Sequence, residues 1–260
     1  MCPFEYHRPK TVAKALELLD RGVPLAGGTE LTPRRDQVPA VIDLQDLGLD
    51  TMESRDDVIA IGAAVKLQTM VENEEQLPST LREACRSEAS LNLRNMATLG
   101  GTVMSADGRS PVVTVLLAMD AIAILEPGSE TLSLEELLDR RDRDDFHGLI
   151  TEIRLKLPGF LRYEQVSRAP ADRPLVCVAM ARLPGDGTKK GYRVVLGGFG
   201  SSPIRIKKAE TYLSEGEDIN TAAEAARRAY ATAGDVWASD EYRAHSASVL
   251  VRRLAMEITG

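Results

Sequence analysis

Two glycine pairs, far apart in the chain, most constrain how it can fold. The first lies in LAGGTEL, Leu25 to Leu31, directly after a short apolar run that predicts a strand. The second lies in RNMATLGGT, Arg94 to Thr102. Glycines at such turns permit positive φ and let an anionic group approach the main chain without a Cβ in the way. Successive amides there can form a concave anion site, so the two loops together are expected to clamp a dinucleotide through its pyrophosphate.

The residues of the two loops supply the expected hydrogen-bond donors. Thr29 and Thr98 add hydroxyl groups, and the N–H groups of Leu99 to Thr102 are expected to face the ligand. Neither loop follows the G-x-G-x-x-G order of a Rossmann unit or the P-loop with its Lys-Ser/Thr ending. The usual NAD and nucleoside triphosphate sites are therefore disfavoured. For either loop alone, a simple tight turn after a strand is the alternative interpretation.

Length and composition fit two globular lobes. The chain has 260 residues, of which 43% are hydrophobic, enough to bury a core in one large or two modest domains. Its 32 basic and 39 acidic residues contain no basic block, which argues against a nucleic-acid surface. The N-terminal segment lacks the apolar core of a signal peptide, and no apolar run is long enough to span a bilayer. We therefore expect a soluble, cytoplasmic protein without a membrane partner.

The cysteines and histidines form no metal-binding pattern. Cys2, Cys85 and Cys177 are odd in number and far apart, which indicates neither a disulfide framework nor a thiolate cluster. The three histidines are equally scattered and lack metal-ligand spacing. No G-x-S-x-G elbow or Cys–His signature indicates a nucleophile paired with a base. We expect no metal site and no catalytic side chain.

Hydrophobic periodicity predicts an α+β chain. An amphipathic helix begins after the N-cap Thr11 and ends at Gly22. The charged string 139–145 mixes signs and is expected to be a solvated loop, and Pro158 with Gly159 marks a boundary between lobes. Further strands are expected at 23–26, 40–44, 58–65, 121–125, 149–157, 161–167, 175–181 and 192–199, and further helices at 67–77, 78–89, 112–119, 133–139, 221–232 and 242–258.

Several segments, in the same order along nearly the whole chain, resemble one known family. Leu25 to Leu31 resembles its AGGT/S-type phosphate loop, and Arg94 to Thr102, followed by LLAMDA at 116–121, resembles its RN-x-GTIGGN…LLALDA stretch. Three later segments are similar to its C-terminal motifs: YEQVSRAPAD at 163–172, LGGFGSSPIR at 196–205 and SDEYRAHSASVLVRRL at 239–254. The family is the FAD-binding (medium) subunit of the molybdenum hydroxylases, which includes the flavoproteins of xanthine dehydrogenase and carbon monoxide dehydrogenase.

The resemblance implies a fold, domain boundaries and FAD contacts. The implied fold is α+β, with a two-subdomain FAD-binding domain of the molybdopterin-dehydrogenase flavoprotein type and a small α/β C-terminal domain containing an antiparallel sheet and helices. The implied domains are 1–158, with subdomains of about 1–55 and 56–158, and 159–260. The implied FAD-binding residues are Leu25, Ala26, Gly27, Gly28, Thr29, Glu30, Leu31, Thr98, Leu99, Gly100, Gly101, Thr102, Asp107, Ile150 and Glu164.

Some positions depart from the family pattern. Thr102 stands where the family has Asn. Pro111 replaces an Asp that usually contacts FAD; it has no N–H and no polar side chain, so the nearby Asp107 is the expected substitute. Glu164 and Ala169 stand where the family has basic residues. The loss of these positive charges would weaken an anion site and disfavours direct use of NAD.

The resemblance also implies an electron-transfer role within an oxidoreductase. FAD is implied to accept electrons from an iron–sulfur subunit and to pass them to NAD or another acceptor, while a molybdopterin-binding subunit hydroxylates the substrate. Two alternatives stay open. A stand-alone flavin reductase of the same fold needs acid groups over the flavin that the sequence does not identify. A flavin-free assembly scaffold, favoured by Thr102, Pro111 and Glu164, predicts a colourless protein.

Overall fold

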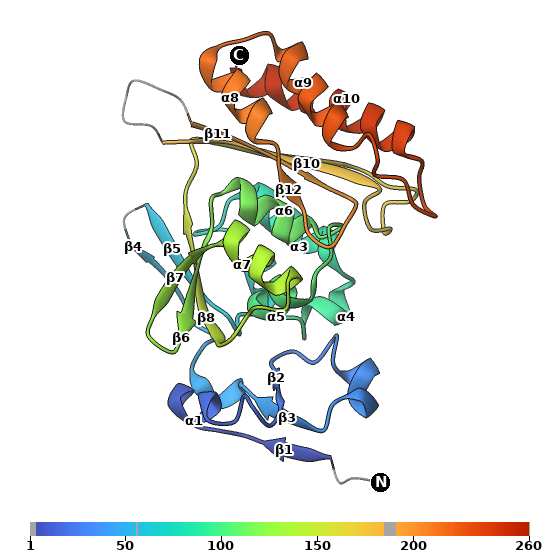
Figure 1. Ribbon diagram of the computed structural model, residues 1–260. Helices are drawn as coiled ribbons and strands as arrows, with labels where there is room; N and C mark the ends of the chain where they lie inside the picture. Colours follow the sequence, from blue (N-terminus) through green and yellow to red (C-terminus); the bar gives the residue numbers. More distant parts are fainter. Residues whose placement is uncertain (1–3, 56, 185–190, 260) are drawn as a thin grey trace.

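Three β-sheets, formed in succession along the chain, organise the structure. The computed structural model describes residues 4–55, 57–184 and 191–259. Figure 1 shows the N-terminal sheet at one end, the central sheet with its helices in the middle, and the C-terminal sheet with its helices at the other end. This is the mixed α+β architecture that the sequence predicts, with an antiparallel sheet and helices in the C-terminal part.

Strands and helices alternate from β1 to η2, and after the hairpin β4–β5 five helices follow one another. The strands are β1 Glu5–His7, β2 Val23–Leu25, β3 Ala40–Asp43, β4 Met52–Arg55, β5 Val58–Gly62, β6 Ile122–Glu126, β7 Glu130–Ser133, β8 Leu149–Lys156, β9 Phe160–Val166, β10 Val176–Leu183, β11 Gly191–Gly197 and β12 Ile204–Arg205. The α-helices are α1 Val12–Leu16, α2 Leu67–Glu72, α3 Ser79–Glu88, α4 Leu91–Arg94, α5 Leu99–Ser105, α6 Pro111–Ala118, α7 Leu134–Asp142, α8 Lys207–Glu215, α9 Ile219–Ala229 and α10 Asp240–Thr259. Two 3-10 helices, η1 Thr32–Gln37 and η2 Gln45–Leu47, flank β3.

The N-terminal sheet is parallel, in the order β1-β3-β2. Thr11 caps α1 as predicted, since its hydroxyl accepts from the N–H of Lys14 at 3.2 Å. The helix ends at Leu16, earlier than expected, and turns carry the chain to Gly22. The parallel order places the carboxyl ends of β2 and β3 side by side, where the first glycine loop begins.

The central sheet is antiparallel, in the order β4-β5-β8-β6-β7. All eight residues of α6 are buried, which confirms the buried helix expected at 112–119. β4 pairs with β5 along its whole length and so belongs to the central sheet; we propose that the subdomain boundary, expected at about residue 55, lies just before Met52. Only residues 56 and 57 separate the end of β4 from the start of β5.

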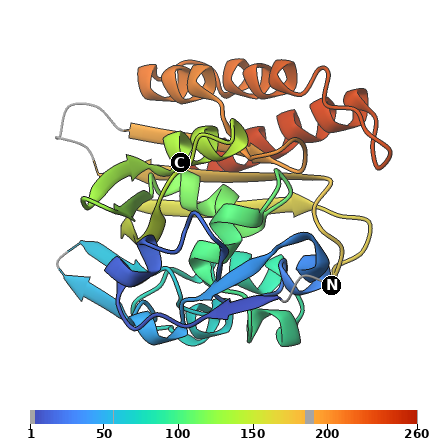
Figure 2. The ribbon, with the colours of Figure 1, turned by 60° about the horizontal axis from the view of Figure 1, so that its bottom comes forward.

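The C-terminal sheet is antiparallel, in the order β12-β11-β10-β9, and is covered on both faces. One face packs on α3 and α6, and the helices α8, α9 and α10 lie over the other, as Figure 2 shows. The two faces divide β10: Ala179 and Ala181 belong to the central core, whereas Val178 and Met180 belong to the C-terminal core. This explains why β10 reads as a continuous apolar run without alternation.

The charged string 139–145 is only in part the solvated loop that the sequence predicts, since most of it is exposed but its first half is helical. α7 continues to Asp142, and the Arg141 side chain is only 11% exposed. Its guanidinium donates to the carbonyls of Val103 at 2.7 Å and Ala106 at 2.8 Å, at the C-terminal end of α5, and to the Ser202 hydroxyl at 2.6 Å. The prediction fails because unpaired carbonyls at a helix end attract a guanidinium from a distant segment.

Two of the three cysteines lie in the described residues. Cys85 and Cys177 are free thiols in the buried core, and Cys2 lies outside the described residues. In the described ranges, no helix has both the length and the apolar character needed to cross a membrane.

Candidate functional site

The two glycine loops touch each other. A Cβ added to Gly27 would lie 1.9 Å from the carbonyl oxygen of Met96 and 3.0 Å from the Cα of Ala97. The backbone of the first loop therefore lies directly against the segment that leads into the second. Gly28 has φ +70°, a conformation that favours glycine, so the two residues of this pair are needed for different reasons: space at Gly27 and backbone conformation at Gly28.

The first loop presents a run of unpaired amides. β2 ends at Leu25, and within the described residues the N–H groups of residues 26–31 donate to no other protein group. Pairing resumes at Thr32, whose N–H donates to the carbonyl of Gly28 at 2.9 Å. All of these residues are at least partly exposed. Main-chain donors left unpaired in a partly exposed turn are available to bind phosphate oxygens.

The second loop does not offer its amides, contrary to expectation. The N–H of Leu99 donates to Val65 at 2.9 Å, and that of Gly100 donates to Ala63 at 2.8 Å. The N–H groups of Gly101 and Thr102 bond to Thr98, through its hydroxyl at 3.3 Å and its carbonyl at 2.8 Å. These amides build the first turn of α5 and anchor it to the central sheet. What the second loop can still offer a ligand is the hydroxyl proton of Thr98 and a surface without a Cβ at Gly101.

Gly100 serves packing. A Cβ there would lie 2.8 Å from the Cβ of Ala63 and 3.0 Å from its carbonyl oxygen. Ile150 is connected to the same place: its neighbour Thr151 accepts from the N–H of Ala63 at 3.0 Å. Ile150 itself is 4% exposed in β8 and pairs with Leu125. The structure thus links Ile150 through Ala63 to the second glycine loop.

Asp107 and Glu164 are both engaged in ion pairs. Asp107 follows α5, accepts from the N–H of Arg109 at 2.8 Å and forms an ion pair with Arg173. Glu164 forms an ion pair with Arg253 of α10 at 2.8 Å. It lies opposite Val178, on the face of the C-terminal sheet that packs against α10 and away from the central helices. The structure does not bring Glu164 to the glycine loops.

One carboxylate near Pro111 was missed by the sequence reasoning. Glu88, at the end of α3, accepts from the Ser110 hydroxyl at 2.7 Å and from the N–H of Val112 at 2.9 Å. Burial raises the pKa of Glu88, although both hydrogen bonds oppose that shift. The amino end of α6 is therefore capped by a carboxylate from another helix. No local pattern identifies Glu88, because the contact joins segments more than twenty residues apart.

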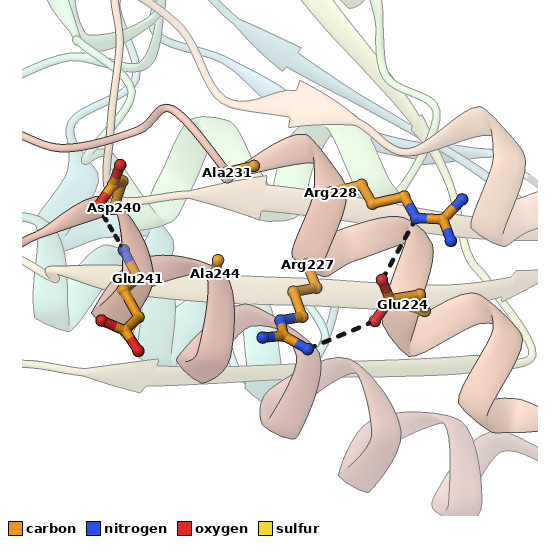
Figure 3. Close-up of a pocket in the computed structure, with 7 residues that line it drawn as sticks. All are labelled: Glu224, Arg227, Arg228, Ala231, Asp240, Glu241 and Ala244. Atoms are coloured by element: carbon orange, nitrogen blue, oxygen red, sulfur yellow. Dashed lines mark hydrogen bonds and ion pairs between the residues drawn. The ribbon is translucent and has the colours of Figure 1, made fainter.

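A surface groove of about 290 Å³ lies elsewhere, between α9 and α10 of the C-terminal part. In Figure 3 the Glu224 carboxylate pairs with both Arg227 and Arg228, whereas Asp240 and Glu241 lie apart from them at the start of α10. Asp240 and Glu241 of the groove form no ion pair within the described residues, but the groove lies in the C-terminal layer, away from the glycine loops. We therefore place the candidate site at the loops. The groove is lined by Glu224, Arg227, Arg228, Ala231, Asp240, Glu241 and Ala244.

Comparison with known proteins identifies the family. Residues 2–157 match the family described as the FAD binding domain in molybdopterin dehydrogenase. The chain belongs to this family. Residues 162–258 match a second family, the CO dehydrogenase flavoprotein C-terminal domain. The predicted family, the two-part fold and FAD as the cofactor are thereby confirmed, and the chain is a flavoprotein of the oxidoreductase class.

Relatives of this molybdopterin dehydrogenase flavoprotein span nearly its full length. Uncharacterized protein YgfM of Escherichia coli (strain K12) is 33% identical, covering 96% of this chain and 94% of the relative. The carbon monoxide dehydrogenase medium chain of Afipia carboxidovorans is 26% identical, covering 96% and 94%. Among solved structures, the Cu,Mo-CO dehydrogenase in its cyanide-inactivated form superposes with a TM-score of 0.80 at 26% identity, covering 97% of each chain.

The residues of the first loop fit the cofactor that the family implies. A flavin diphosphate needs several outward donors and an approach that no Cβ blocks. The unpaired amides of residues 26–31 supply the donors. The backbone of Gly27 lies against Met96 where any Cβ would intrude, which keeps the two loops close enough to share one ligand.

Proposed function

We propose that this flavoprotein binds the diphosphate of FAD between its first glycine loop and the N-terminal turn of α5, and relays electrons from an iron–sulfur partner to NAD or another acceptor. The contact between Gly27 and Met96 carries this proposal, because it joins the unpaired amides of residues 26–31 to the turn that contains the Thr98 hydroxyl.

Each part of the site has a separate proposed role. The amides of residues 26–31 donate to the diphosphate, with the hydroxyls of Thr29 and Thr98 as further donors. The α5 turn, with Thr98 to Thr102, forms the facing wall, and Ile150 supports that wall through Ala63. Bound FAD supplies the redox chemistry. Asp107, which is paired with Arg173, is proposed to hold the chain after α5 instead of contacting FAD, and Glu164 is left out of the site.

A heteromeric assembly is part of the proposal. The caffeine dehydrogenase subunit beta of Pseudomonas sp. (strain CBB1), 29% identical over 81% of this chain, and the carbon monoxide dehydrogenase medium chain are each named as one component of a larger enzyme. We propose that this chain likewise works with an iron–sulfur subunit and a molybdopterin-binding subunit. We also propose a domain boundary near residue 158, supported by the end of β8 at Lys156 and the start of β9 at Phe160.

The experiment purifies the tagged chain from its native host, with its partners, and measures the visible spectrum and the metal content. We expect one FAD per chain, together with iron and molybdenum in copurifying polypeptides. The flavin, once reduced, is then mixed with NAD or with a quinone, and its reoxidation is followed by absorbance. A colourless chain that takes up no added FAD would indicate the scaffold. A flavin-containing chain that copurifies with no iron or molybdenum protein would indicate a stand-alone reductase.

A further inference from the structure

Lys66 lies directly opposite Thr98, in a part of the molecule that the sequence motifs do not include. The two residues form an isolated antiparallel bridge. It is flanked by the hydrogen bonds from Leu67 N–H to the Ala97 carbonyl and from Leu99 N–H to the Val65 carbonyl, each 2.9 Å. This is the non-hydrogen-bonded type of pair, in which the two Cα atoms are about 4.5 Å apart and the side chains lie close together on one side.

The flanking residues show which way Lys66 points. Val65 is 2% exposed and Leu67 is fully buried, whereas Lys66 is exposed, so its side chain leaves the core on the opposite side. Thr98 shares that side of the pair but is itself only 5% exposed, and its hydroxyl accepts from the N–H of Gly101. The flexible four-carbon stem of Lys66 therefore starts beside the α5 turn that faces the first glycine loop.

Local structure does not explain a lysine at this position. Lys66 is the N-cap of α2, where Ser, Thr, Asp or Asn would cap the helix and where a positive charge is unfavourable. Its side chain makes no capping hydrogen bond. A residue that stabilises neither its own helix nor the core is a candidate for ligand binding.

The surrounding cations are already engaged, and Lys66 forms no ion pair within the described ranges. Arg34, which follows the first loop, pairs with Glu30 at 3.7 Å. Arg94 donates to the carbonyls of Arg86 and Ala89 and to the side chain of Gln68. The predicted site therefore combines neutral donors with an anionic ligand and has one neighbouring cation still available.

We propose that Lys66 supplies the positive charge that pairs with the diphosphate of FAD. The inference rests on the proposed function, because it requires the diphosphate to lie between the two glycine loops. Lys66 would place a positive charge on the α2 side of the site. On that side the amides of the α5 turn already donate to protein groups and cannot bind the diphosphate. A charge-assisted hydrogen bond from an ammonium group is stronger than one from a neutral amide, so its removal should be measurable.

The test compares three ligands on the full chain stripped of flavin: FAD, ADP, which has the diphosphate without the flavin ring, and riboflavin, which has the ring without the diphosphate. We expect Lys66→Gln to weaken binding of FAD and ADP by roughly three- to tenfold and to leave riboflavin binding unchanged. Lys66→Arg should restore most of the affinity. FAD binding to Lys66→Gln should also depend less on salt, since one screened charge is gone.

Lys208→Gln is the matched control, because Lys208 is equally exposed on α8 in the C-terminal layer. It should bind all three ligands like the wild type. If the wild type binds FAD and Lys66→Gln binds it equally well, the role of Lys66 is refuted while the proposed function stands. An equal loss for riboflavin would also refute it, since that would reflect general damage to the site. A wild-type chain that binds neither FAD nor ADP would overturn both proposals.

Discussion

Replacing Gly27 by alanine should force the two loops apart. The added Cβ would lie 1.9 Å from the Met96 carbonyl oxygen, whereas an ordinary contact needs about 3.4 Å. The obstacle is main chain, which cannot rotate away as a side chain can. The loops must therefore separate by the difference between these distances, about 1.5 Å. Such a shift lengthens hydrogen bonds to a shared ligand beyond their useful range.

The shift should affect both stability and FAD affinity. Overpacking of this kind costs about 1–3 kcal/mol, and each kcal/mol lowers Tm by roughly 2–4 °C in a chain of this size. We expect a Tm lower by about 2–12 °C and an FAD affinity reduced at least about tenfold, which corresponds to roughly 1.4 kcal/mol of binding free energy. Thermal denaturation followed by circular dichroism and flavin fluorescence titration measure the two effects.

Gly48→Ala separates loss of stability from loss of binding. Gly48 has φ +67° and no atom within 4 Å of an added Cβ, so alanine there costs about 1–2 kcal/mol through backbone conformation alone. It should lower Tm and leave FAD affinity unchanged. If Gly27→Ala keeps wild-type Tm and binds FAD as tightly as the wild type, the loops do not share a ligand in the manner argued above.

Three further predictions concern the framework of the fold. Arg141→Met should lower the free energy of unfolding, measured in urea, by about 2–4 kcal/mol, because it leaves the carbonyls at the end of α5 unpaired. The control Arg143→Met removes only an exposed i,i+4 ion pair and should change the free energy of unfolding by less than about 0.5 kcal/mol. Equal effects of the two variants would contradict the role of Arg141. Arg243→Met should cost about 3–5 kcal/mol, since the guanidinium is fully buried between the Gly198 carbonyl and Asp235; a change below about 1 kcal/mol would argue against it. Burial raises the pKa of the Cys177 thiol from 9.0 to about 11, so the folded chain holds this proton more tightly than the unfolded chain and loses stability as the pH rises from 9 toward 11. Urea titrations across that range should show the loss in the wild type and a flatter curve for Cys177→Ala; identical curves would exclude the thiol as the cause.

Some features of the site followed directly from residue order. The N-cap at Thr11, the buried helix expected at 112–119 and the turn at the glycine pair after β2 were each predicted locally, and all three appear in the fold. The resemblance to the molybdenum hydroxylase flavoproteins depended on segments spread along the chain, and the family match bears it out. These features are determined locally, by caps, periodicity and turn chemistry.

Other features required the tertiary structure. The amides of Leu99 to Thr102 look free in the sequence, but the carbonyls of Ala63 and Val65, in the turn after β5, accept hydrogen bonds from two of them. Arg141 appears solvated, and Glu164 appears to belong to the site, until the packing of α5 and α10 shows their actual partners. The sequence by itself determined many of the turns, helices and strands, because those preferences act over a few residues. It did not predict the short strands β1, β4 and β7 or the helices α5 and α8. The tertiary structure alone decided which donors remain free for a ligand, because a main-chain N–H can bond to any carbonyl that the fold brings near it, however distant in sequence.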